Sequence, residues 1–294
     1  MQGRPGLETP EPAHAASPTT PPPWHGRKRL VALAVALGLV AAIATAGYVW
    51  WRVRGPTRPS IGQAVHRFRA SSGHQTRTAR LQPPPGVYSY TGQGDERLSF
   101  LSTQQSQAGT LPGTVTRTAN GCWSFSVQYN SFHRQAWRRC TVDGRLVELG
   151  NTTDQKFDFG PLSQTEHTEV VCTPPITLYD PATAPGHHEP IRCRGHSQTT
   201  KANATQLGRV TYIGPGTVTV AGTKVPTLHY SEDTKLSGGQ HGTAHEEVWL
   251  AAEDGLPLRE QRTIRVVSPA PAPLNEVTYT EQGTWRLSSL TPRT

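Results

Sequence analysis

An uncharged apolar stretch, Leu30–Trp51, constrains this chain more than any other feature of its sequence. As a helix rising about 1.5 Å per residue, it would reach roughly 33 Å, and the hydrocarbon core of a bilayer is about 30 Å thick. Tyr48, Trp50 and Trp51 lie at its second end, where aromatic rings favour the headgroup region. The stretch therefore predicts a single transmembrane helix over residues 30–51. A signal segment cleaved after Ala46 is the alternative, but signal apolar regions usually span only about 7–15 residues.

The segments on either side of this stretch differ in composition. Residues 1–29 hold seven prolines and little apolar surface, which predicts a disordered tail. Residues 52–80 hold seven arginines and no acidic residue, whereas residues 81–294 hold 18 basic and 19 acidic residues, a net −1. The overall charge of +8 therefore belongs largely to a basic juxtamembrane stalk, residues 52–82. Arginines beside a bilayer attract anionic headgroups, so we expect this stalk to contact membrane lipids and no part of the chain to bind nucleic acid.

One short helix is expected inside the stalk, over residues 60–69. Ser60 and Gln63 have the spacing of a capping box. Apolar residues then recur at helical spacing: Ile61, Ala64, Val65 and Phe68. Their common face needs a partner, and the following domain is favoured over the membrane surface.

From Pro83 onward, hydrophobicity alternates with a period of two in many short segments, with a proline-rich break at 174–190. Turn pairs such as Asn120-Gly121 and Asp254-Gly255 separate these segments. Turn signals roughly every 8–12 residues indicate an all-β sandwich or barrel. The fold class is therefore mostly β, with an antiparallel domain over residues 83–294. One continuous sheet and two similar halves, about 83–173 and 191–294, both fit the pattern.

The cysteines determine the compartment. Cys122, Cys140, Cys172 and Cys193 are the only four, and none belongs to a C-x-x-C pair. Pairing between neighbours predicts two disulfides, Cys122–Cys140 and Cys172–Cys193, and disulfides persist in oxidising compartments. We therefore expect the tail to be cytoplasmic and the carboxyl-terminal domain to be extracellular, in a single-pass protein of the cell membrane.

A search for catalytic chemistry finds no motif. There is no G-x-S-x-G, H-E-x-x-H, S-x-x-K or phosphate-binding glycine loop. The histidines at 187–196 and 241–245 lie among prolines and glycines, in loops that give a metal no fixed geometry. We therefore expect a protein that is not an enzyme, with no catalytic residue, no metal and no cofactor.

Aromatic residues on the predicted strands are the remaining candidates for a site. Core packing accounts for most of them, but some of them can line a cavity between a curved sheet and a covering segment. The candidate ligand contacts are Tyr212, Tyr230, Trp249 and Tyr279.

Two short motifs carry a resemblance to a known group. Val248-Trp249-Leu250, followed by Gly255-Leu256-Pro257-Leu258-Arg259, resembles the tryptophan strand and hairpin of lipoprotein-carrier-like (LolA/LolB-like) domains. The ending at 277–292 is similar to the terminal strand of that group. Taken with the motifs Pro84–Tyr90 and Gly121-Cys122-Trp123, the sequence over about 60–292 resembles single-pass envelope proteins of high-GC Gram-positive bacteria. The resemblance implies an antiparallel half-barrel whose concave face holds an acyl chain or a peptide.

Alternation over Glu246–Ala251 places Val248 and Leu250 on one face of a strand and Trp249 on the other. Because the helix at 60–69 is too short to cover a wide curved sheet, we expect an open apolar groove on the concave face near Trp249. The leading hypothesis is a membrane-anchored extracytoplasmic binding domain for a lipid, a lipoprotein or another apolar envelope ligand. The alternative is a structural or regulatory docking component of an envelope complex.

Overall fold

The computed structural model describes residues 57–72, 81–99, 104–118, 120–159, 162–199, 201–269 and 275–294. The predicted tail 1–29 and the predicted transmembrane helix 30–51 lie outside these ranges. Within them, no helix combines the length and the apolar character needed to cross a membrane. The sheet and the helix α2 belong to one compact unit, residues 54–294.

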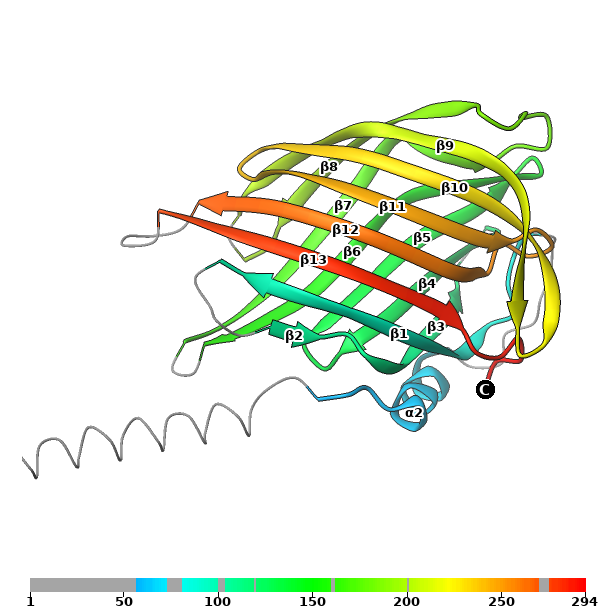
Figure 1. Ribbon diagram of the computed structural model, residues 1–294, viewed down its shortest axis with the longest axis horizontal. Helices are drawn as coiled ribbons and strands as arrows, with labels where there is room; N and C mark the ends of the chain where they lie inside the picture. Colours follow the sequence, from blue (N-terminus) through cyan, green and yellow to red (C-terminus); the bar gives the residue numbers. More distant parts are fainter. Residues whose placement is uncertain are drawn as a thin grey trace, which may run out of the picture. The chain divides into compact units, whose positions relative to one another are not determined.

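The described chain forms one helix and one antiparallel sheet (Figure 1). Each strand pairs with its neighbours in sequence, in the order β13 back to β3, then β1 and β2. The elements are α2 (Ile61–Ser72), β1 (Gly86–Leu98), β2 (Gln104–Ser106), β3 (Gly109–Arg117), β4 (Cys122–Asn130), β5 (His133–Val142), β6 (Arg145–Phe159), β7 (Leu162–Tyr179), β8 (His188–Ser197), β9 (Asn203–Val220), β10 (Thr223–Gly238), β11 (His241–Ala251), β12 (Pro257–Pro269) and β13 (Glu276–Leu287).

The sheet closes on itself because β1 also pairs with β13, from Tyr90 opposite Leu287 to Leu98 opposite Tyr279. On its other edge β1 pairs with β3 and then, in the same register, with β2. The amide of Gln107, between them, donates to the carbonyl of Gly94 at 3.0 Å. β2 and β3 thus act as one interrupted strand, and the wall is a closed barrel of twelve strands. The predicted half-barrel or sandwich is wrong, because pairing between the first and last strands leaves no open edge.

The sheet is also continuous through the region where two halves were conceivable. β7 runs to Tyr179 and therefore extends into the stretch predicted as a proline-rich break at 174–190. It stays paired with β6 across two register shifts, at Leu146/Val147 and at Glu148/Gly150. These irregularities absorb the prolines, which cannot donate to a ladder. One sheet, and not two packed subdomains, builds the domain.

Helix α2 packs against the outside of the barrel. Its Ala64 and Phe68 are buried against Val87 of β1, with Ile61 and Val65 beside them. The helix predicted over 60–69 is thus present and ends three residues later than predicted, at Ser72. Its apolar face packs against the following domain, as expected. It contacts β1 and β3 from outside, so it neither lines nor covers the interior.

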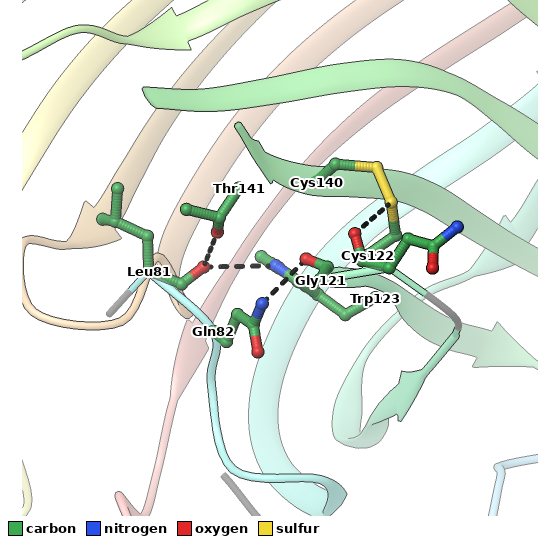
Figure 2. Close-up of a disulfide and its surroundings, with 8 residues drawn as sticks. Leu81, Gln82, Gly121, Cys122, Trp123, Cys140 and Thr141 are labelled. Carbon is green, nitrogen blue, oxygen red and sulfur yellow. Dashed lines mark hydrogen bonds between the residues drawn. A yellow bond between two sulfur atoms is a disulfide. The ribbon is translucent and has the colours of Figure 1, made fainter. Parts of the chain in front are cut away.

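One end of the barrel is filled and closed. Aromatic and aliphatic side chains from most strands form a single cluster there, in which Trp123, Phe125 and Trp285 are fully buried. Leu81, 1% exposed, reaches this cluster from the segment before β1. Its carbonyl accepts hydrogen bonds from Trp123 Nε1 and Thr141 Oγ1, both at 3.2 Å (Figure 2). The segment is thereby fixed across this end of the barrel.

Both predicted disulfides are confirmed. Cys122 and Cys140 lie opposite each other on β4 and β5, next to the Leu81 contacts (Figure 2). Cys172 and Cys193 lie opposite each other on β7 and β8 and belong to the interior cluster. Each bond therefore joins adjacent strands.

Removing either disulfide should destabilise the barrel. The bonds span 18 and 21 residues of sequence, for which the chain-entropy model gives about 3 kcal/mol each. The paired changes Cys122→Ser with Cys140→Ser, and Cys172→Ser with Cys193→Ser, should each lower the free energy of unfolding by that amount in urea titrations. Unchanged midpoints would show that cross-linking does not restrict the unfolded chain.

At two glycines a neighbouring strand comes too close for a side chain. A Cβ atom on Gly208 would lie 2.0 Å from the Asp233 carbonyl oxygen, and one on Gly242 would lie 2.1 Å from that of Arg265. No side chain fits at these separations, so the neighbouring strand approaches the backbone directly. Such glycine positions are where curved sheets turn.

Gly208→Ala should therefore destabilise the protein by about 1–3 kcal/mol, the usual cost of overpacking a tight site. Gly195→Ala is the matched control, since its Cβ would lie 3.6 Å from Val170 Cγ2, an ordinary contact. Urea unfolding of the two variants should show a clear loss for the first and little change for the second. Equal stabilities would contradict the close approach at Gly208.

Candidate functional site

The inward-facing positions change character along the barrel. On β10 they run Leu228, Tyr230 and then Glu232, and on β12 they run Leu258, Glu260 and Arg262. Period-two alternation places these charged residues on the same face as the apolar core. The same switch occurs on other strands, and it creates a second interior region, which we call the polar chamber. Its lining residues are Glu96, Gln107, Tyr129, His133, Gln135, Arg139, Glu148, Gln155, Glu232, Glu246, Glu260, Arg262, Tyr279 and Glu281.

One wall of the polar chamber is a buried network around Glu96. His133 Nδ1 lies 2.7 Å from Glu96 Oε1, and Gln155 Nε2 donates to Glu96 Oε2 at 2.9 Å. Gln107 Nε2 donates to Glu96 Oε1 at 2.7 Å and to Glu281 Oε1 at 2.6 Å. Burial favours a raised pKa for Glu96, but the charge and hydrogen bond of His133, together with Gln107, hold that pKa below its ordinary value.

Glu96, His133 and Glu281 place three possible metal-ligand atoms within 4.8 Å of one another. The amide nitrogen of Gln107, however, already lies between the two carboxylates and bonds to both. Arg262 also donates to Glu281. In this arrangement the two carboxylates already have hydrogen-bond partners, and a metal ion would have to displace the Gln107 and Arg262 donors.

The other wall carries an excess of carboxyl groups. Glu148 accepts from Arg139 Nε at 3.0 Å. Glu232 lies opposite Glu246 across β10 and β11, and Glu246 lies opposite Arg262 across β11 and β12. In the described part of the chain, neither the Glu232 side chain nor the Glu246 side chain has a hydrogen bond or an ion pair. Glu260 Oε1 lies 3.7 Å from Arg262 Nη1, too far for a hydrogen bond.

The pKa values in this wall follow from burial and like charge. Burial, and then the charge of Glu246, raise the pKa of Glu260 to about 8. Burial, and then the charges of Glu148 and Glu246, raise the pKa of Glu232 well above its ordinary value. The pKa values of Glu246 and Glu148 are raised too, first by burial. These carboxyl groups therefore hold protons at a pH where exposed glutamates have lost them.

Several buried polar atoms of the polar chamber have no hydrogen-bond partner among the described residues. They are the Tyr129 hydroxyl, Glu260 Oε1, Arg139 Nη1 and Arg262 Nε. A buried polar group without a partner costs about 1–3 kcal/mol, and native proteins contain few of them. Several in one chamber indicate that water or a ligand completes it.

The polar chamber is accessible from the barrel end opposite Leu81. Glu232 and Glu246 are half-buried, as are the inward Leu236 and Ala244 beyond them on the same strands. A cavity of about 50 Å³ lies beside Leu236, lined by Thr168, Val170, Gly195, Ser197, Ala204 and Gln206. Most of these side chains are small, and they come from β7, β8 and β9.

The four aromatic residues predicted as ligand contacts do not come together. The rings of Tyr212 and Tyr230 lie 5.3 Å apart and line a cavity of about 10 Å³, enough for a water molecule. Tyr279 lies in the polar chamber, where its hydroxyl donates to Glu281 Oε2 at 2.8 Å. Trp249 is on the outer wall. Whether any of them contacts a ligand stays a prediction.

The position of Trp249 corrects the predicted groove. Alternation correctly placed Trp249 on the face opposite to Val248 and Leu250. The concave face, however, carries Val248 and Leu250, and Trp249 is on the convex face. Trp249 stacks with His229, ring centroids 4.2 Å apart, and the Arg259 guanidinium lies 4.5 Å from its ring. Its partners are therefore side chains of the two adjacent strands, on the convex side.

Sequence reasoning missed the buried carboxyl groups of the polar chamber. Glu232, Glu246 and Glu260 each lie two residues from an apolar inward residue: Tyr230, Val248 and Leu258. A charged residue in phase with a buried apolar face is the signal that could have found them. Taken singly, such a residue is also compatible with a strand end in water.

Comparisons with known proteins add little. No protein-family model and no curated protein matches the chain. Among solved structures, it is similar to the hypothetical lipoprotein YmcC from Escherichia coli (K12), with 14% identity over 70% of this chain and 85% of that chain, and a TM-score of 0.33. A likeness at that TM-score defines no shared function.

The raised pKa of Glu260 should make stability depend on pH. The folded state holds this proton up to about pH 8, whereas an ordinary glutamate, near 4.5, loses it earlier. The free energy of unfolding contributed by this group therefore falls as pH rises from about 4.5 to about 8, and Glu260→Gln should flatten the fall. Urea unfolding between pH 4 and 9 measures this. Glu189→Gln, an exposed position on β8, should leave the profile unchanged.

Proposed function

We propose that this barrel is a non-catalytic binding domain of an extracytoplasmic compartment and that its ligand enters the polar chamber from the accessible end. The observation that carries the proposal is the set of buried polar atoms in this chamber that have no hydrogen-bond partner among the described residues. Barrels of more than about eight strands are wide enough to enclose a ligand. The two disulfides favour an oxidising compartment.

The interior limits how an apolar ligand would bind. At the closed end Trp123, Phe125 and Trp285 fill the space, and no acyl chain fits among them without displacing side chains. A lipid or lipoprotein ligand, as predicted from the sequence, would therefore place a polar group in the chamber and its apolar part toward the accessible end. The inward Leu236, Ile264 and Val266, all half-buried, provide apolar contacts there.

The alternative is a docking role in an envelope complex, carried by the outer wall. Val171, Leu207 and Ile213 are 44%, 49% and 46% exposed. These side chains are scattered over β7 and β9, and isolated exposed apolar residues are ordinary on protein surfaces. The polar chamber is the stronger candidate.

Native mass spectrometry of the full-length protein purified from its own host tests the proposal. We expect a bound small molecule on the wild-type protein and its loss from a Glu232→Gln, Glu246→Gln double variant. Glu247→Gln, on the same strand as Glu246 but facing outward, should retain the adduct. Protein without an adduct, or with a captured partner protein alone, would refute the proposed binding function.

A further inference from the structure

The charges of the polar chamber do not balance. Three of its glutamates have a basic partner: Glu96 with His133, Glu148 with Arg139, and Glu281 with Arg262. Three remain without a hydrogen-bonded base: Glu232, Glu246 and Glu260. Because the two interior arginines already hold carboxylates, the polar chamber has three more carboxyl groups than hydrogen-bonded basic partners, and these become negative only when they lose their protons.

The three surplus carboxyl groups come from consecutive strands. Glu232 and Glu246 are direct cross-strand partners on β10 and β11. Glu246 lies opposite Arg262 on β12, and Glu260 is two residues before Arg262 on the same face. Direct partners have Cβ atoms about 5 Å apart and diagonal ones about 7–8 Å apart. The three side chains are therefore neighbours on the inner face of three adjacent strands.

The Tyr129 hydroxyl is a separate indication that something belongs in this space. Tyr129 comes from β4, is 1% exposed, and its hydroxyl has no partner among the described residues. Burial raises its pKa, the Arg262 charge opposes that shift, and Glu260, Glu281 and Glu246 add to it. The Arg262 guanidinium carbon lies 4.2 Å from the centre of the Tyr129 ring, and Arg262 Nη1 lies 3.7 Å from Glu260 Oε1, so Tyr129 is close to the surplus carboxyl groups without bonding to them. The hydroxyl provides an acceptor, and its lone pairs are unused.

The chemistry of the wall distinguishes between possible cations. The triad Glu96, His133 and Glu281 has metal-ligand atoms, but the Gln107 amide and the Arg262 guanidinium occupy it. Among the described residues, no histidine or cysteine has a hydrogen bond or ion pair with the surplus carboxyl groups, so metals that prefer nitrogen or sulfur ligands are disfavoured. An ammonium group brings three donors for three acceptors. Glu232 and Glu246 are half-buried, so such a group can reach them from the accessible end.

We propose that the polar chamber recognises an organic cation, whose ammonium group is held by Glu232, Glu246 and Glu260 with the Tyr129 hydroxyl beside it. This inference rests on the proposed function and names the chemical class of its ligand. Other charged groups face the cluster from neighbouring walls: Arg139 on β5, Glu148 on β6, Arg262 on β12 and Glu281 on β13. Because the pKa of Glu260 is raised to about 8, and that of Glu232 is raised above its ordinary value, binding of the cation releases protons.

Isothermal titration calorimetry of the full-length protein with pentane-1,5-diamine tests the inference, with pentane-1,5-diol and glutarate as uncharged and anionic controls of the same length. We expect only the diamine to bind, at least tenfold more weakly at pH 5 than at pH 8. In buffers of different ionisation enthalpy, the heat should report proton release. Glu232→Gln and Glu260→Gln should each weaken binding at least tenfold at pH 8, and Glu247→Gln should not.

The glutamine variants should remain folded, because an amide is close in shape to the protonated acid that the chamber favours; urea unfolding verifies this. Equal or tighter binding of the diol or glutarate would overturn the cation assignment. The cation assignment is also overturned if no probe binds while native mass spectrometry still shows a bound molecule. In that case the binding function stands and the proposed ligand class is wrong. Absence of both the adduct and probe binding refutes both proposals.

Discussion

Pairing between β1 and β13 is the constraint on which the rest of this structure depends. It joins Tyr90–Leu98 to residues 279–287, nearly two hundred residues later in the chain, and converts a sheet with two edges into a wall with an inside. Only an enclosed space can hold charged groups away from bulk water, and only there do carboxyl pKa values rise as those of Glu232 and Glu260 do. The acidic character of the interior is a consequence of closure.

The interior then divides by the residues that each strand places inward. At the end where Leu81 crosses the barrel, aromatic and aliphatic side chains pack against one another and supply the apolar burial that stabilises the wall. On β10, β11 and β12, the inward positions next to Tyr230, Val248 and Leu258 are occupied by glutamates. Their burial opposes folding, because a carboxyl group without a base loses its hydration. A stable apolar half makes it possible for the other half to keep such groups.

Local patterns in the sequence predicted much of this architecture. Alternation gave the β class and the face of Trp249 within its strand, and pairing of cysteines that are neighbours in sequence gave both disulfides, because each depends on residues close in sequence. Closure was not predicted, since the register of β1 with β13 depends on the accumulated twist of all strands between them, including the close backbone approaches at Gly208 and Gly242. Without closure, inside and outside are undefined. Trp249 was therefore assigned to the concave face, and the buried glutamates could not be distinguished from exposed ones.

The order of the strands has a consequence for how the barrel assembles and where it can open. Every pairing except one joins segments adjacent in sequence, so the wall can form by successive hairpins with short loops to close. The β1–β13 seam alone must bring distant segments together, and contacts of that kind form late because their loop-closure entropy is largest. Neither disulfide crosses the seam, which is held by ladder hydrogen bonds and by the edge-on contact of Tyr90 with Trp285. It is therefore the line along which a partly opened barrel would separate while its remaining strands stay paired.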